Sequence, residues 1–424
     1  MAEGVGFSVD RRILALSFAR MADGIGNSFL IIVIPLYVVS DIVTGQTFGL
    51  TEAMITGVIL SIYGFLNSGI QPLTGRLSDR TGRRRLYILI GLGGLTLTNL
   101  AYVLADSYAG LLTVRALQGV SVAFIVPASI ALVNELSTSG GRGGSMGIYN
   151  TFRLIGFGAG PVAAGAVVAA GPYPVPGTAL TVNGFHAAFY VAAVTAALSS
   201  LLVWVLITDP EDLSPSREGR PPIRVWSRGA DRLLDPVFTL GLATLFTATA
   251  IALFATIQPQ VNARLEQGST WFGLQFAAFI VAQVVLQTPI GRASDLVGRR
   301  PFIVWGMVLM VPTTLLQGFV VTPETMFVAR LLQGIAGAML LAPSLALAGD
   351  LAGKGESGTT LSVLTMAFGL GIALGPLTSG FLIGFGFVVP FAFGAGITLV
   401  GVALVATQVE ETVEARPVVS LLDR

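Results

Sequence analysis

The chain has 424 residues, of which 53% are hydrophobic and only 11% are charged, and its net charge is +1. Soluble domains carry roughly 25% charged residues, so this composition indicates an integral membrane protein. The near-neutral net charge gives no reason to expect a nucleic-acid partner. Because the chain contains no cysteine, disulfides, thiolate catalysis and metal sites with cysteine ligands are excluded.

Twelve apolar segments are long enough to cross a membrane, since a spanning helix needs about 20 apolar residues. The sequence therefore predicts an all-α membrane protein with twelve transmembrane helices in two pseudo-symmetric six-helix bundles. We expect a first bundle in 1–208, a polar linker in 209–235, a second bundle in 236–408 and a tail in 409–424. The predicted spans are 12–40, 53–74, 86–105, 110–134, 146–170, 185–208, 236–260, 272–290, 301–321, 325–348, 358–382 and 386–407.

Arginine-rich connections alternate with connections that carry almost no basic residue. Residues 75–85 hold five arginines and 291–300 hold three, whereas 41–52 and 171–184 hold none. Short cytoplasmic loops are enriched in Lys and Arg. We therefore expect both termini and the linker to lie in the cytoplasm, with the protein in the cell membrane.

Several motifs recur after about 215 residues. GRLSDRTGRRR at 75–85 returns as GRASDLVGRR at 291–300, and RALQG at Arg115 returns as RLLQG at Arg330. Two parallel repeats of this kind place a substrate path between them. Two further matches at the same displacement are Gly160-Pro161 with Gly375-Pro376, and Glu135 with Asp350.

These motifs resemble those of the major facilitator superfamily. The two charged stretches are similar to its loop signatures between helices 2 and 3 and between helices 8 and 9, and RALQGVSVA is similar to its helix 4 signature. GFGAGPVAAG, at 156–165, is similar to the helix 5 signature that marks exporters, and Asp23 twelve residues before Pro35 resembles the twelve-span drug:proton antiporters, which include tetracycline exporters. The resemblance implies a secondary transporter that exports amphipathic or hydrophobic small molecules in exchange for protons.

Asp23 lies about ten residues into the first span, hence roughly 15 Å deep. A charge there costs about 2.5–3.5 kcal/mol on insertion scales, so we expect Asp23 to face a cavity and to carry protons. No carboxylate matches it in the seventh span. The structural alternative is a pair with Arg20, one turn earlier, or with Arg153 in the fifth span. Arg115 would act on Asp23 as the helices rock, or would simply snorkel to the surface.

The charged stretches predict a gate at the inner mouth. Asp79 can cap the positive end of a neighbouring helix, which leaves Arg83 to pair with Glu135. Such pairs would lock the cytoplasmic side when the transporter faces outward and would break when it opens inward. The alternative is that the arginines only anchor the topology. The predicted gate residues are Gly75, Asp79, Arg83, Glu135, Asp295, Arg299 and Asp350.

In the superfamily, helices 1, 4, 7 and 10 line the cavity, and the resemblance implies a set of substrate contacts on them. These are Asn27, Gln118, Phe124, Phe246, Phe254, Arg330, Gln333 and Met339. Small residues permit close contact between membrane helices, so the fifth and eleventh spans are expected to form the sliding contact between the bundles. The residues of this contact are Gly156, Gly160, Pro161, Gly165, Gly371, Gly375, Pro376 and Gly380. Ordinary close packing is the alternative.

No P-loop, HExxH, dinucleotide fingerprint or nucleophile elbow occurs in a suitable context. We expect no enzyme activity, no cofactor and no metal, and a monomer whose partners are a small-molecule substrate, protons and the lipid bilayer. Two other functions stay open. One is a facilitator or organic-anion exchanger in which Arg115 and Arg330 bind a carboxylate or phosphate symmetrically, and the other is a non-transporting membrane sensor on the same scaffold.

Overall fold

The computed structural model describes most of the chain, with gaps between and beyond the helices. The described residues are 11–47, 49–137, 142–174, 176–178, 180–209, 225–227, 232–351 and 357–412, without the side chains of 142–144, 357–360 and 362. Most of the predicted linker 209–235, with Arg217, Arg220, Arg224 and Arg228, lies outside the described residues. The same holds for the predicted tail from residue 413 onward.

In the described part of the chain, each predicted span corresponds to one long helix. The first half contains α1 (Arg11–Val38), α2 (Glu52–Thr81), α3 (Arg84–Ala101), α4 (Tyr108–Leu136), α5 (Arg142–Ala170) and α6 (Gly184–Leu206). The second half contains α7 (Pro236–Thr256), α9 (Ser269–Val297), α10 (Arg299–Leu316), α11 (Pro323–Leu351), α12 (Ser357–Leu382) and α13 (Val389–Gln408). The short elements are η1 (Tyr102–Leu104), α8 (Gln258–Arg264), η2 (Ile383–Phe385) and the antiparallel strands β1 (Tyr173–Pro174) and β2 (Thr181–Val182).

Eleven of the described helices are long and apolar enough to cross a membrane. The remaining long helix, α10, has only 18 residues and begins with Arg299 and Arg300, so the charged start of the helix lowers its mean hydropathy. The protein is therefore a multi-pass membrane protein built from helices.

The charged stretches form sharp turns between helices instead of loops. α2 continues seven residues beyond its predicted end, and Gly82 closes it with φ 67° while its N–H donates to the Ser78 carbonyl. In the second half Gly298, with φ 126°, separates α9 from α10. Positive φ suits glycine, which has no Cβ. The charged side chains of both stretches therefore stand on helix ends, where their positions are fixed.

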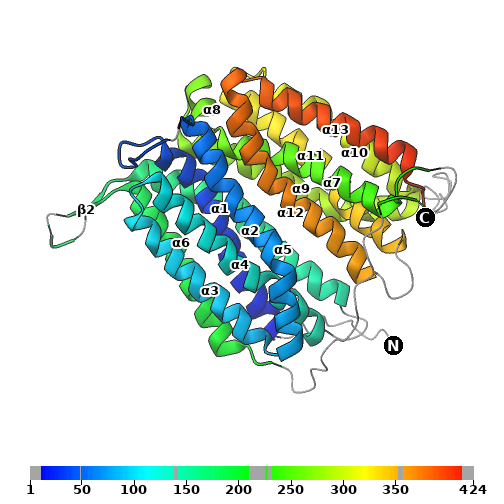
Figure 1. Ribbon diagram of the computed structural model, residues 1–424, viewed down its shortest axis with the longest axis horizontal. Helices are drawn as coiled ribbons and strands as arrows, with labels where there is room; N and C mark the ends of the chain where they lie inside the picture. Colours follow the sequence, from blue (N-terminus) through cyan, green and yellow to red (C-terminus); the bar gives the residue numbers. More distant parts are fainter. Residues whose placement is uncertain are drawn as a thin grey trace, which may run out of the picture.

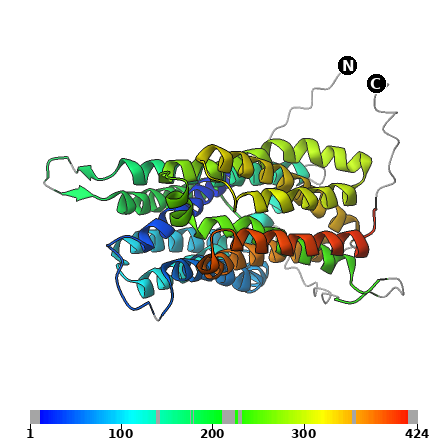
Figure 2. The same ribbon diagram turned by 90° about the horizontal axis from the view of Figure 1, so that it is seen from above.

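The two ends of the molecule are distinguished by their connections. We call the end that carries the turns at Gly82 and Gly298 the hinge end, and the opposite end, which carries α8 and the β1–β2 hairpin, the hairpin end. Figure 1 shows α1–α6 in one half of the molecule and α7–α13 in the other. Figure 2 shows the hairpin extending beyond the helices at its end.

The buried side chains form one shared core and two separate ones. The shared cluster joins residues of both halves near the hairpin end, such as Tyr37 and Tyr102 with Phe254 and Phe272. A second cluster, which includes Leu16 and Leu132, contains residues of the first half alone. The third contains only residues of the second half. The halves thus share an apolar core at the hairpin end and have their own cores toward the hinge end.

Backbones of the two halves touch where α2 meets α12 and α5 meets α9. A Cβ at Gly57 would lie 2.5 Å from the Pro376 oxygen, and a Cβ at Gly165 would lie 2.6 Å from the Ser269 oxygen. Among the described residues, such close contacts between the halves extend from the hairpin end to about the middle of the helices. Toward the hinge end, Gly75 faces Pro127 of its own half. The halves are therefore closed against each other at the hairpin end.

Candidate transport site and charged hinges

Asp23 lies in the interior of α1 and is only 5% exposed. One carboxylate oxygen forms an ion pair with Arg20, one turn earlier on the same helix. The other oxygen, Oδ1, is buried and has no hydrogen-bond partner in the described part of the chain. The intrahelical pair is thus formed, yet it leaves half of the carboxylate free to accept a further bond or a proton.

Two further polar side chains surround this pair. Arg153 of α5 donates from Nε to Asn150 Oδ1 at 3.0 Å, and within the described residues it forms no ion pair with Asp23. Its charge nevertheless acts on Asp23, and Tyr63 of α2 lies within electrostatic range of both Asp23 and Arg20. Asp23 therefore shares its neighbourhood with two guanidinium groups.

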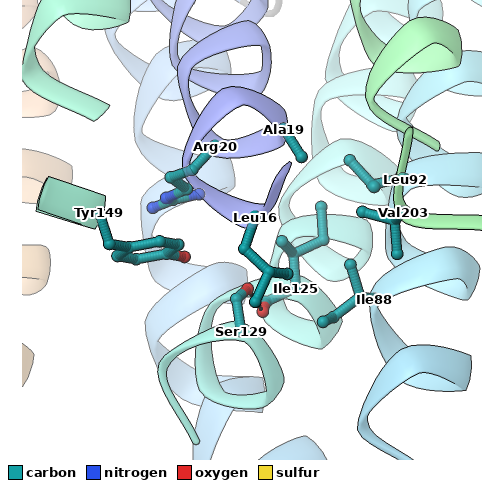
Figure 3. A pocket seen from close by; sticks show the side chains of 9 residues that line it. All are labelled: Leu16, Ala19, Arg20, Ile88, Leu92, Ile125, Ser129, Tyr149 and Val203. Atoms are coloured by element: carbon teal, nitrogen blue, oxygen red, sulfur yellow. Dashed lines mark hydrogen bonds between the residues drawn. The ribbon is translucent and has the colours of Figure 1, made fainter. Parts of the chain in front are cut away.

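A small cavity of about 10 Å³ lies beside Arg20 inside the first half. Such a space is close to the minimum that one water needs. Figure 3 shows Arg20 and Tyr149 on one side of the cavity and apolar side chains on the other. Arg20 Nε and the Tyr149 hydroxyl are both buried without a partner. The lining residues are Leu16, Ala19, Arg20, Ile88, Leu92, Ile125, Ser129, Tyr149 and Val203.

Arg115 of α4 belongs to a hydrogen-bonded network. Its Nη1 donates to Gln118 Oε1 at 2.5 Å, and the Tyr102 hydroxyl donates to the same oxygen at 3.2 Å. Gln118 Nε2 in turn donates to Asn99 Oδ1 at 2.8 Å. The guanidinium carbon lies 4.3 Å from the centre of the Tyr63 ring. Arg115 is thus 2% exposed and held by α2, α3 and its own helix, and it does not snorkel to the surface.

Arg330 of α11 occupies the equivalent position in the second half, with fewer partners. Its Nη1 donates to Gln333, whose Nε2 donates to Thr314 Oγ1 at 3.0 Å. Nε and Nη2 are buried and have no partner, and the side chain is 0% exposed. The two arginines are therefore not equivalent. An exchanger that uses them as symmetric anion sites is not what this geometry favours.

At the hinge end of the first half, Arg84 holds three helices together. Its Nη1 donates to Asp79 Oδ1 of α2 at 2.6 Å, and its Nη2 donates to Glu135 Oε1 of α4 at 2.8 Å. The expected partner of Glu135, Arg83, is instead the exposed N-cap residue of α3. Because α2 continues to Thr81, the turn is shorter than expected. The arginine that points toward Asp79 and Glu135 is therefore Arg84, one residue after the expected Arg83.

The second half repeats this arrangement. Arg299 forms ion pairs with Asp295 of α9 and Asp350 of α11, and the expected pairing of Arg299 with Asp350 is present. Asp350 also accepts a hydrogen bond from the Thr412 hydroxyl at 2.7 Å. Each hinge thus links three helices of its own half through one arginine and two carboxylates.

These hinge networks do not bridge the two halves. They are complete in a structure whose halves are closed against each other at the hairpin end. The pairs are formed in this structure, and the expectation that they break when the hinge end opens stays a prediction. They brace each half internally, and any influence of Asp79 or Gly75 on the transport cycle stays a prediction.

Three of the predicted substrate contacts pack within their own half. Phe124 stacks on Tyr87 of α3 with ring centres 6.2 Å apart. Phe246 faces Gly401 of α13, and Met339 faces Gly306 of α10. Aromatic and Met side chains at helical spacing fill cores as readily as cavities, but these three side chains are only partly buried, so their role as substrate contacts stays a prediction. Two other predicted substrate contacts also stay predictions. Asn27 has a buried Oδ1 without a partner among the described residues, and Phe254 lies beside Arg330.

The small residues of α5 and α12 fall into two groups. Gly156 and Gly160 pack against α1, and Gly371 and Gly375 pack against α7, each within one half. The remaining residues form the contact between the halves. Pro161 and Gly165 meet Gly273 and Ser269 of α9, and Pro376 and Gly380 meet Gly57 and Ala53 of α2. Only the second group matches the expected sliding contact.

Comparison with known proteins decides the family. The model of the Major Facilitator Superfamily matches residues 16–258 and 240–420. The chain belongs to the major facilitator superfamily. Its members are membrane-embedded transporters of small molecules, so the chain is a multi-pass transporter of this superfamily, and the predicted family and fold are confirmed.

Curated relatives within the superfamily include drug-resistance proteins. The chain is 27% identical over 391 residues to multidrug resistance protein MdtG of Citrobacter koseri, with 89% of each chain covered. It is 26% identical over 165 residues to Multidrug resistance protein 2 of Bacillus subtilis, covering 39% of this chain and 41% of the relative. Tetracycline resistance protein, class H, of Pasteurella multocida is 27% identical over 157 residues, covering 36% and 39%. The last two matches thus span about two fifths of the relatives' length.

Solved structures share the fold over nearly the whole chain. The human organic anion transporter MFSD10 has a TM-score of 0.65 and 19% identity, with 93% of this chain and 99% of that chain covered. A bacterial homolog of the human lysosomal transporter Spinster has a TM-score of 0.68 and 15% identity, with 93% and 94% covered.

Several site residues were missed by sequence reasoning. Arg84 was overlooked because the end of α2 was placed too early. Gly57 and Gly273, which touch the opposite half, occupy matching places in the repeat, 216 residues apart, and this match could have identified them. Phe276 and Phe279, whose rings lie beside Arg330, could not be identified from the sequence, because they are two of many apolar residues in a spanning segment.

Proposed function

We propose that this transporter is a proton-coupled antiporter that exports amphipathic small molecules by alternating access. The observation that carries the proposal is Asp23, a buried carboxylate inside a spanning helix with one oxygen paired and the other unpartnered. Ionisable groups at membrane depth are expensive and usually functional. Protonation of Asp23 would remove its charge from the pair with Arg20, and that change of charge can bias the packing of α1 against α5.

The arrangement of the halves supplies the moving parts. They meet along α2 with α12 and along α5 with α9, and each half is braced by its own hinge network. Rigid halves that pivot about such a contact would open one end while the other closes. With the arginine-rich hinge end in the cytoplasm, this structure is the state that is closed to the outside.

Similarity to drug-resistance proteins supports the proposed direction and substrate class. Multidrug and tetracycline resistance proteins are among the relatives, and the chain covers most of one of them. One proton that moves with the membrane potential supplies about 2.3 kcal/mol per 100 mV, which can sustain a substrate gradient of several tens-fold. We propose the cell membrane as the location, with the protein acting as a monomer.

The test is substrate-driven proton movement in proteoliposomes with a pH-sensitive dye inside. Its substrate would come from a growth-inhibition screen of amphipathic compounds in a host that lacks its own exporters. We expect substrate addition to move protons in the opposite direction, and Asp23→Asn to abolish the signal. The matched control is Asp41→Asn, an exposed aspartate at the hairpin end, which should behave as wild type. Substrate flux with an undiminished proton signal in Asp23→Asn would exclude this carboxylate as the coupling group.

A further inference from the structure

One edge of the Arg330 guanidinium has no hydrogen-bond partner among the residues that the structure describes. Nη1 is bonded to Gln333, whereas Nε and Nη2, the two nitrogens that share the opposite edge, are buried without a hydrogen bond. This edge is the fork with which arginine binds both oxygens of a carboxylate in parallel. An arginine in a protein interior stays protonated, so among the described residues these N–H groups lack an acceptor and no carboxylate balances the charge.

Three phenylalanine rings surround this guanidinium. Its carbon lies 4.5 Å from the centre of the Phe254 ring, 4.9 Å from that of Phe279 and 5.6 Å from that of Phe276. Aromatic faces attract a cation, but they cannot accept the in-plane bonds that the fork offers. The rings therefore stabilise the cation but leave the Nε and Nη2 hydrogen bonds unformed. They also provide apolar surface that suits the body of an amphipathic molecule.

The interior of the described helices carries an excess of positive charge. Away from the helix ends there are four arginines, Arg20, Arg115, Arg153 and Arg330, and one carboxylate, Asp23. Asp23 is engaged by Arg20 in the first half, and among the described residues no carboxylate forms an ion pair with Arg330. An interior with this excess of positive charge attracts anions and repels cations.

Access to Arg330 depends on the state of the transporter. Phe254, Phe276 and Phe279 belong to the apolar cluster that joins the halves near the hairpin end. Arg330 stands seven residues after the start of α11, hence about 10 Å from that end of the helix. Separation of the halves at the hairpin end would uncover the fork. A ligand on this fork therefore favours the state open at that end.

We propose that Arg330, with the rings of Phe254, Phe276 and Phe279, binds the carboxylate of an amphipathic organic anion, so that the cargo of this transporter is a carboxylate with an apolar body. The inference rests on the proposed function in one respect only, namely that the bound molecule is the cargo. Arg115 is a weaker candidate for such a site: among the described residues only its Nε is buried without a hydrogen-bond partner, whereas both nitrogens of the Arg330 fork are, and the Tyr63 ring lies against its guanidinium.

The test is ligand binding to the purified full-length protein in nanodiscs, with no proton gradient. Three probes of one shape are compared by thermal shift and calorimetry: 2-naphthoate, the neutral 2-naphthamide and the cationic 2-naphthylmethylammonium. We expect the carboxylate to bind at least about 10-fold more tightly than the other two, since charge-assisted bidentate bonds are the strong ones. Equal affinity for all three probes, or preference for the cation, would overturn the proposal.

Substitutions of Arg330 test whether the carboxylate binds at this residue. Arg330→Gln should abolish the preference for the carboxylate, and Arg330→Lys, which keeps the charge and loses the fork, should weaken carboxylate binding about 10- to 100-fold. The control is Arg264→Gln, which removes an exposed arginine of α8 that also lies over an aromatic ring, that of Phe387, at 4.6 Å. It should bind as wild type. Unchanged carboxylate binding in Arg330→Gln would place the anion elsewhere and contradict the proposal.

A second measurement guards against misfolded variants. Because no carboxylate of the described residues balances the charge of Arg330, Arg330→Met should leave the melting temperature of the ligand-free protein unchanged or raise it, while the shift on adding 2-naphthoate disappears. A large fall in the melting temperature together with an intact naphthoate shift would show that Arg330 is structural. This experiment is independent of Asp23, so a failure of proton coupling and a failure of this site are distinguishable.

Discussion

The two halves differ around an arginine that the repeat preserves. Arg115 and Arg330 stand 215 positions apart, and each donates to a glutamine three residues later. In the first half a tyrosine hydroxyl and an asparagine extend the network. In the second half, residue 317 is glutamine where the first half has Tyr102, and Thr314 replaces the asparagine. The repeat thus preserves the arginine–glutamine pair, while the side chains that hold the glutamine differ, and the second copy leaves one more arginine nitrogen without a partner among the described residues.

The first way to test this comparison is to remove the arginine of each hinge. Arg84→Met leaves Asp79 and Glu135 without a cation, and loss of one member of a buried pair is strongly destabilising. With partial exposure of these carboxylates, we expect a loss of about 2–3 kcal/mol. Arg299→Met should cost less, because the Arg299 side chain is 17% exposed against 9% for Arg84.

Chemical denaturation followed by circular dichroism would measure both losses. Arg80→Met, an exposed arginine in the last turn of α2, serves as the control and should unfold as wild type. Equal losses in Arg84→Met and Arg80→Met would show that the ion pairs do not brace the first half.

The second test concerns the contact between the halves. A Cβ at Gly57 would lie 2.5 Å from a backbone oxygen of α12, and overpacking costs about 1–3 kcal/mol. Gly57→Val should therefore shift the population toward the state that is open at the hairpin end. Gly69→Val on the same helix, where no atom lies within 4 Å of the added carbon, should not.

Distances between the halves report this shift. Because the chain has no cysteine, spin labels can be attached at Ile42→Cys and Ala263→Cys, two exposed positions at the hairpin end. Longer distances in Gly57→Val than in Gly69→Val are expected. Identical distance distributions would mean that the close backbone contact does not hold this end shut.

The third test compares the arginine networks directly. Asn99 links Gln118 to the Ala192 carbonyl of α6, with bonds of 2.8 and 3.0 Å. Asn99→Ala leaves the Gln118 amide N–H without its acceptor, at roughly 1–3 kcal/mol of stability, and also removes one of the two side-chain bonds to the Ala192 carbonyl, which keeps the Thr195 hydroxyl as a donor. Thr314→Ala likewise leaves one amide N–H, Gln333 Nε2, without its acceptor but removes no second bond, so it should cost less. If thermal unfolding shows the larger loss for Thr314→Ala, the description of the first half as the more fully braced copy is wrong.

The smallest effect is expected for Asp79→Asn. Its side chain is 37% exposed, and Arg84 keeps Glu135 as a partner, so we expect a loss of about 0.2–1 kcal/mol. Because the pair lies within one half, the distance between spin labels across the halves should stay unchanged. A changed distance distribution would restore Asp79 to the gating role that the motif suggests.

The helical architecture could be predicted from the sequence because the patterns that indicate it extend over many residues. Apolar segments of about 20 residues and a repeat of about 215 positions fix the helices and their pseudo-symmetry, and the pairing of Arg299 with Asp350 followed from matching depth. Short-range geometry was less accessible. The inward-facing arginine of the first hinge depends on where Gly82 ends α2, a shift of one residue that composition does not reveal.

Side-chain direction around each helix was also beyond the sequence. Phe124 and Met339 are on the expected helices, but they face α3 and α10 of their own half, and an apolar helix has no polar face to show which side meets the partner half. The unpartnered edge of Arg330 could not be foreseen for the same reason, since it depends on which rings surround the guanidinium.

The central claim is that proton coupling resides in the first half, at Asp23, and ligand binding in the second, at Arg330. The most direct measurement is naphthoate-driven proton movement in proteoliposomes of Asp23→Asn, made beside naphthoate binding to the same variant. The account predicts binding within about 3-fold of wild type and no proton signal. A full proton signal in this variant would contradict it.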